Sequence, residues 1–144
     1  MAHSTRVYST VAIKAVDDEI RDLALKFVDK AKADNKPFFL WLNPTRMHIV
    51  THLSPKYQAT RNSKNGWSIH EAGMAQMDDD IGLVMQKLKD MGVDDNTIVV
   101  FTTDNGTEVF TWPDGGQTPF AQPQGTIMEA SFRAPTTLRW PGQV

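Results

Sequence analysis

Two stretches of the chain repeat apolar residues at three- and four-residue steps, which is typical of amphipathic helices. The first follows the acidic residues Asp17-Asp18-Glu19 and predicts a helix over about residues 18–33. The second begins after Ser68, with Glu71 three residues further on as in a capping box, and predicts a helix over about residues 69–91. Each helix needs a partner surface for its apolar face, so the pattern predicts a packed domain.

Two continuous apolar runs, Phe38–Leu42 and Thr97–Thr102, are rich in aromatic or β-branched residues and predict strands buried on both faces. A further short strand is expected at Thr136–Trp140. Because helix and strand alternate along the chain, the sequence predicts the α/β class, with a parallel sheet that carries helices on its faces.

The second apolar run leads into Asp104-Asn105-Gly106. Carboxylate and amide oxygens suit hard divalent cations, and open α/β sheets bind ligands at the carboxyl edge of their strands. Gly106 is free to take a positive φ angle. The alternative is that Asp-Asn-Gly forms only a turn, since these residues favour turns for local reasons.

The loop after the first apolar run carries His48 and His52, four residues apart. On a helical turn these two side chains would share a face, as metal-ligand pairs do. Such loops often carry function, although a lone loop histidine is commonly a surface or capping residue. Lys56 is a candidate contact for an anion, with a solvated basic face as the alternative. The run Asp78–Asp80 occupies consecutive helical positions, so its side chains are expected to fan out into solvent instead of meeting at one ion.

Composition narrows the classes of function. The 144 residues include no cysteine, which excludes disulfides, thiolate metal sites and a cysteine-derived nucleophile in this chain. A net charge of −2 and a pI near 6.0 give no indication of a nucleic-acid or membrane partner. The sequence has no run of membrane-span length and no signal-peptide segment, so we expect the chain in the cytoplasm as expressed, while its natural compartment stays open. The length favours a single domain over residues 1–144.

Three segments in register resemble the arylsulfatase-type sulfatases of the alkaline phosphatase superfamily. They are Lys36–Leu42 with the following His48, the strand and turn Thr97–Gly106, and Gly125–Gly142. The resemblance runs from about residue 15 to the end of the chain. It implies a partial alkaline-phosphatase-like sheet with flanking helices, as a single truncated sulfatase-like domain.

The resemblance also implies roles for individual residues. Asp104 and Asn105 match the late pair of divalent-metal ligands in the family. His48 matches a histidine that contacts the sulfate ester and transfers a proton at the leaving oxygen, which suits histidine near neutral pH. Gln124 stands where the family has a sulfate-contacting lysine, and Arg133 ends the stretch that in the family is Glu-Gly-Gly-x-Arg.

The chain departs from the family pattern in three further respects. It lacks the first strand with paired aspartates, and it has no Cys-x-Pro-Ser-Arg motif, so no formylglycine nucleophile can form. In the Glu129–Arg133 stretch both glycines are replaced, by Ala130 and Ser131. The mechanism of the family therefore cannot run on this chain alone.

Three hypotheses follow. The first is a metal-dependent hydrolase of sulfate, phosphate or related small anionic esters. In it Asp104, Asn105 and His52 hold Zn²⁺, Mn²⁺ or Ca²⁺, His48 is catalytic, and the substrate-binding residues are Lys56, Gln124 and Arg133. Mixed histidine and carboxylate ligation favours Zn²⁺ or Mn²⁺ over Ca²⁺. The second is an inactive sulfatase fragment that acts as a structural or binding module and forms a homodimer or higher oligomer through unpaired sheet edges. The third is an anion-binding module without turnover.

Overall fold

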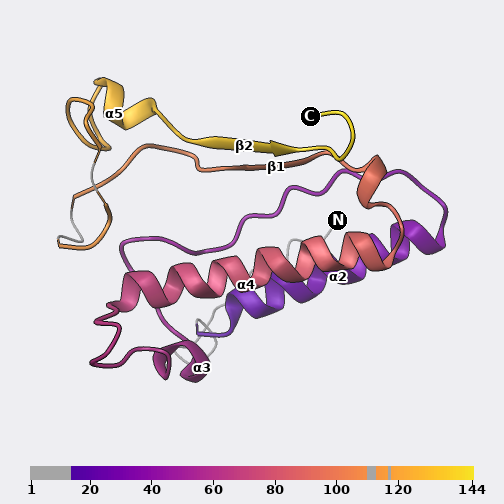
Figure 1. Cartoon of the computed structure of the whole chain (residues 1–144), viewed down its shortest axis with the longest axis horizontal. Helices are drawn as coiled ribbons and strands as arrows, with labels where there is room; N and C mark the ends of the chain where they lie inside the picture. The colour runs from indigo at the N-terminus through magenta and orange to yellow at the C-terminus, as the bar shows by residue number, and fades with distance from the viewer. Residues whose placement is uncertain (1–13, 110–112, 117) are drawn as a thin grey trace, which may run out of the picture. The chain divides into compact units, whose positions relative to one another are not determined.

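The computed structural model describes residues 14–109, 113–116 and 118–144. It divides into two compact units, Met1–Val84 and Met85–Val144, and each is described by itself. The elements in chain order are α2 (Val16–Ala33), α3 (Pro55–Gln58), α4 (Ile69–Asp90), a 3₁₀ turn η1 (Asp94–Asn96), β1 (Val99–Thr102), α5 (Glu129–Phe132) and β2 (Thr136–Arg139) (Figure 1). None of the helices in the described ranges combines the length and the apolar character that a bilayer crossing requires.

Both predicted long helices are confirmed, α2 within two residues of its predicted start and α4 within one residue of its predicted end. The capping box at the start of α4 is present. The Ser68 N–H donates to Glu71 Oε2 at 2.8 Å, and the His70 N–H donates to Ser68 Oγ at 2.9 Å. Hydrogen bonds from Ser68 lower the pKa of Glu71 below its ordinary value. This cap therefore stabilises the helix above the ordinary carboxylate pKa and loses its contribution as the pH falls through the lowered value.

A small apolar core in the first unit joins α3 to the start of α4. Leu53, Tyr57 and Ala72 are buried and in contact. Nearby, the loop before α3 lies so close to α4 that a Cβ built on Gly73 would fall 2.3 Å from Met47 Sδ. The loop that carries the two histidines is thus packed directly onto α4.

The sheet of the second unit is a two-stranded antiparallel pair, in register from Val99 opposite Arg139 to Thr102 opposite Thr136. Arg139 also donates to both carboxylate oxygens of Asp94, each at 2.7 Å. These hydrogen bonds lower the pKa of Asp94, so the pair contributes stability that is lost as the pH falls through the lowered value.

One strand prediction was wrong, and a second was wrong in part. Phe38–Leu42 forms no strand, and the side chains of Phe39 and Trp41 are 83% and 78% exposed. β1 does form, but it is not buried, and Phe101 is 45% exposed. The α/β class is confirmed, whereas the predicted parallel pairing is antiparallel in the described residues. An apolar run becomes a buried strand only when neighbouring strands and covering layers are present, and the sheet described here has two strands.

Candidate functional site

The turn Asp104-Asn105-Gly106 lies just beyond the carboxyl end of β1, as predicted. Asp104 is exposed, and its Oδ1 accepts a long hydrogen bond of 3.4 Å from the Thr103 hydroxyl. Asn105 donates from Nδ2 to the carbonyl of Gly106 at 2.9 Å, which engages the nitrogen of its amide. The turn thus offers a carboxylate and an amide oxygen, both of which are ligand types for a hard divalent cation.

Gly106 is required for close approach, and it does not use the freedom of glycine to take a positive φ angle. Its N–H donates to the carbonyl of Ser131 in α5 at 2.9 Å. A Cβ at this position would lie 1.6 Å from the carbonyl oxygen of Ala130, closer than any two such atoms can approach. The backbone of α5 therefore rests directly on the turn and holds it in place.

The stretch before α5 is also tied to this turn. The backbone N–H of Gln124, whose side chain is exposed, donates to the carbonyl of Thr107 at 2.6 Å. Arg133 pairs with Glu129 one helical turn away, and its guanidinium lies 4.3 Å from the centre of the Phe120 ring. Within the second unit, the segments that carry Gln124 and Glu129 thus both contact the Asp104 turn, and Arg133 already has an acidic partner.

In the first unit, His48 and His52 lie in a loop, as predicted, and the loop has no helical turn on which the two side chains would share a face. His48 is exposed, and its carbonyl accepts a hydrogen bond of 2.7 Å from the Thr51 hydroxyl. His52 is half-buried and lines a cavity of about 430 Å³ together with Lys14 and Gln58. The two side chains therefore have different surroundings.

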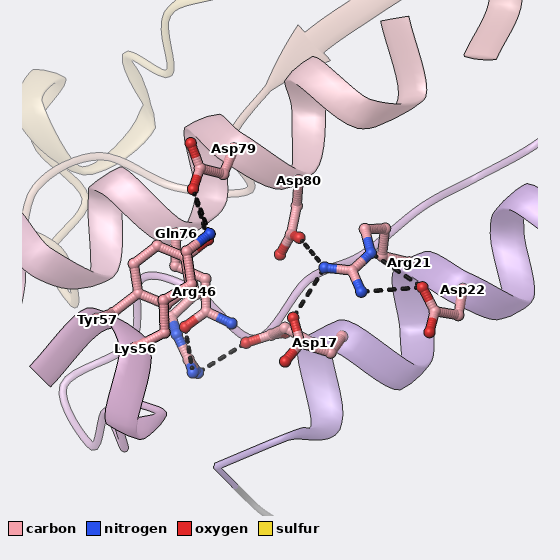
Figure 2. Close-up of polar contacts among 10 residues, drawn as sticks. Asp17, Arg21, Asp22, Arg46, Lys56, Tyr57, Gln76, Asp79 and Asp80 are labelled. Carbon is pink, nitrogen blue, oxygen red and sulfur yellow. Dashed lines mark hydrogen bonds and ion pairs between the residues drawn. The ribbon is translucent and has the colours of Figure 1, made fainter. Parts of the chain in front are cut away.

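Lys56 is engaged with neighbours of its own unit. Its ammonium donates to Asp79 Oδ2 and to the Tyr57 hydroxyl, each at 2.9 Å, and the Tyr57 hydroxyl donates to the same carboxylate at 2.7 Å (Figure 2). The hydrogen bonds from Tyr57 and Lys56 lower the pKa of Asp79. The charge of Lys56 is thus balanced by a carboxylate, and an anion would have to compete with Asp79 for it.

The acidic run on α4 is only partly solvated. Its side chains diverge as predicted, because Asp79 contacts Lys56 whereas Asp80 accepts a hydrogen bond of 2.6 Å from Arg21 on α2 (Figure 2). Asp80 is 7% exposed, and burial raises its pKa above the ordinary value despite the arginine. The expectation that the whole run faces solvent was therefore wrong for Asp80.

Asp17, Arg46 and Gln76 form a buried polar cluster that the sequence did not predict (Figure 2). Arg46 Nη1 lies 2.7 Å from Asp17 Oδ2, and the two side chains are only 2% and 1% exposed. Arg46 Nη2 donates to Gln76 Oε1 at 3.0 Å. One pattern could have indicated the cluster: Ala72, Gln76 and Asp80 follow at four-residue steps, so the buried face of this part of α4 is largely polar.

Asp104 and Asn105 fit a divalent cation by donor type but supply only two ligands. Across residues 14–109, 113–116 and 118–144, no three histidine, aspartate or glutamate side chains gather as a metal centre would require. His48 and His52 belong to the other unit. The described residues thus hold part of a donor set.

These elements define an α/β chain in which a strand is followed by a turn whose carboxylate and amide oxygens are of the kind that binds divalent cations. The chain belongs to the sulfatase family, whose family model matches residues 3–144. It is 34% identical over 124 residues to human N-acetylgalactosamine-6-sulfatase and 30% identical over 146 residues to N-acetylgalactosamine-6-O-sulfatase of Bacteroides thetaiotaomicron, which covers 84% and 89% of this chain. The crystal structure of the PsFucS1 sulfatase from Pseudoalteromonas sp. matches 99% of the chain with a TM-score of 0.87 at 30% identity.

The chain spans only part of these relatives. It covers 23% of the human protein, 27% of the Bacteroides protein and 28% of the Pseudoalteromonas chain. The prediction of a sulfatase-like core that corresponds to part of the family domain is therefore confirmed.

Proposed function

We propose that this chain is a metal-dependent hydrolase of sulfate or related small anionic esters. The observation that carries the proposal is the Asp104-Asn105 turn of a sulfatase-family chain, held at the end of β1 by the backbone of α5. Two relatives are named as N-acetylgalactosamine 6-sulfatases, so sugar 6-sulfates are the first natural substrates to test.

In this proposal Asp104 and Asn105 of the second unit would supply ligands to a Zn²⁺ or Mn²⁺ ion. A bound divalent cation supplies charge neutralisation at the ester oxygens and makes a water more acidic, which would replace the formylglycine nucleophile that a chain without cysteine cannot form. His48 is exposed at its loop and transfers the proton at the leaving oxygen.

Three side chains are proposed to contact the anionic group. Gln124 is exposed and can donate from its amide. Arg133 and Lys56 carry positive charge but are paired with Glu129 and Asp79, so substrate would compete with these carboxylates. Both pairs lie at the surface, where ion pairs are weak. Little free energy is therefore lost when a sulfate group replaces the carboxylate as the partner of either side chain.

Metal content and chelation test the proposal directly. We expect about one metal ion per chain, hydrolysis of nitrophenyl sulfate or phosphate that is lost after chelation, and recovery on adding Zn²⁺ or Mn²⁺. Asp104→Ala should lower kcat/KM by about a hundredfold or more, because it removes the carboxylate of the Asp104-Asn105 ligand pair.

Asp95→Ala is the matched control, since Asp95 is an exposed carboxylate of the same unit and should leave turnover unchanged. Hydrolysis that survives both chelation and Asp104→Ala would contradict the metal mechanism. Saturable sulfate binding without product would instead support an anion-binding module.

A second candidate function is a non-catalytic module that associates with itself. It is favoured by the exposure of Phe39 and Trp41 in an apolar run that forms no strand. Unpaired extended backbone with large apolar side chains invites pairing with another chain.

This second function predicts a homodimer or higher oligomer by light scattering across protein concentration. Replacing Phe39 and Trp41 together with threonine should shift the population toward monomer. The control is Ile127→Thr, because Ile127 is 90% exposed and lies in the other unit. A wild-type protein that stays monomeric at every concentration argues against self-association.

A further inference from the structure

The loop that carries His48 and His52 has no helix or strand of its own, so its shape depends on the contacts of individual side chains. His48 and the next two residues, Ile49 and Val50, are exposed. A group that transfers protons must be held close to its working geometry, because small displacements reduce rates strongly. The side-chain contacts that anchor this loop therefore decide how well the position of His48 is fixed.

Arg46 ties the loop to two helices at once (Figure 2). One guanidinium nitrogen, Nη1, lies 2.7 Å from Asp17 Oδ2 at the start of α2. The other, Nη2, donates to Gln76 Oε1 in α4 at 3.0 Å. The same nitrogen donates to the backbone carbonyl of His52 at 2.8 Å, so the arginine holds the backbone of one of the two histidines.

Asp17 holds the other end of the loop. Its Oδ1 accepts the backbone N–H of Thr45 at 2.6 Å, and its Oδ2 accepts the Thr45 hydroxyl at 2.9 Å. Thr45 and His52 are thus both fixed by one buried cluster. The segment between them can move only as a short closed loop whose ends are anchored.

The cluster is poorly suited to stability alone. Asp17 is 1% exposed and Gln76 is fully buried, so charged and polar groups have been removed from water. Buried ion pairs are often no more stabilising than apolar side chains of similar volume. In addition, Arg46 Nε and Gln76 Nε2 are buried without a hydrogen-bond partner in the part of the chain that the structure describes. The directional hydrogen bonds to the loop backbone are what apolar residues could not supply.

We propose that Asp17, Arg46 and Gln76 form a positioning cluster that fixes residues 45–52, and with them His48, against α2 and α4. The catalytic consequence rests on the proposed function of His48, whereas the ordering of the loop does not require turnover. The three side chains act through the loop and touch no substrate.

Hydrogen exchange tests the ordering without reference to activity. Arg46→Lys keeps a positive charge opposite Asp17, but an ammonium cannot reproduce the planar fork that reaches four acceptors, on Asp17, Thr45, His52 and Gln76. We expect exchange of the Thr45 amide, which donates to Asp17 Oδ1 at 2.6 Å, to accelerate by about tenfold or more, while amides of α2 and of the first part of α4 keep their protection. Gln76→Leu removes one tie, keeps the Arg46–Asp17 pair, and should give a smaller increase at the same amide.

The matched control is Arg61→Lys. Arg61 lies in the loop after α3 and donates to the carbonyl of Trp67 and to the side chain of Gln58, so its replacement should leave exchange of the Thr45 amide unchanged. If Arg46→Lys does not fold, Gln76→Leu carries the test. Exchange that rises equally in the helices and the loop, or a loop that does not respond, overturns the proposal.

Kinetics separate positioning from simple stability. With nitrophenyl sulfate as the substrate, Arg46→Lys should lower kcat by about tenfold while KM stays within about twofold. In a His48→Gln background the same replacement should have no further effect on kcat, because the cluster acts through His48. An additive loss in that background overturns the link to His48. A further outcome is possible: Arg46→Lys loosens only the loop, while the wild-type protein shows no turnover. That result would support the positioning cluster and reject the proposed function instead.

Discussion

Replacing Asp17 with alanine is expected to lower the free energy of unfolding by about 3 to 5 kcal/mol. The reason is the state in which Arg46 is left. Its side chain is only 2% exposed, so without Asp17 a positive charge would remain in the interior with no carboxylate to balance it. The replacement also removes both acceptors that hold Thr45. Urea denaturation followed by circular dichroism measures the loss.

Two further variants serve as controls for Asp17→Ala. Asp22→Ala, on the same helix, removes a carboxylate that is 55% exposed and pairs with Arg21, and it should cost less than about 1 kcal/mol. Replacing Asp17 with leucine and Arg46 with methionine together removes both charges and should recover most of the stability lost in Asp17→Ala. If Asp17→Ala is no more harmful than Asp22→Ala, the buried pair does not anchor the loop in solution.

Gly106→Ala is expected to destabilise the second unit by about 3 kcal/mol. The added methyl group would lie 1.6 Å from the carbonyl oxygen of Ala130, and the obstacle is backbone that cannot rotate away. The strain must therefore be relieved by moving α5 off the turn, which breaks the hydrogen bond of 2.9 Å from Gly106 to Ser131. Under the proposed function, metal binding at Asp104 and Asn105 should weaken in parallel.

Gly82→Ala is the matched control and should act in the opposite direction. Gly82 lies inside α4, and a Cβ at this position would have no atom within 4 Å. Alanine is a better helix former than glycine by about 1 kcal/mol, so this variant should be more stable than the wild type. Thermal unfolding of the two alanine variants beside the wild type provides the measurement. Similar effects from both would show that close approach at Gly106 is not the cause.

Local sequence alone determined the helices and their ends. Two local patterns predicted them: the apolar periodicity over α2 and α4, and the Ser68–Glu71 capping box. Each involves residues within a few positions of one another, so it can be recognised without knowledge of the rest of the chain. The same holds for the position of Asp104 just after β1, since a β-branched run followed by Asp-Asn-Gly fixes where the strand ends.

The reason that Gly106 is glycine came only from the tertiary structure. Its sequence context allowed a positive φ angle, but the decisive contact is with Ala130, which lies far along the chain. A local pattern carries no information about which distant backbone will approach a residue.

Burial of the strands and of the polar residues was likewise decided by tertiary structure. Phe38–Leu42 has the composition of a buried strand, yet Phe39 and Trp41 are exposed because the described sheet consists of β1 and β2 alone. Conversely, Asp17 and Gln76 are polar residues of amphipathic helices, so the sequence places them at the surface. In the structure both are buried, because Arg46, from a loop between those helices, pairs with each of them. Hydrophobic pattern predicts which side chains prefer burial, whereas the surroundings that the rest of the chain provides decide which are buried.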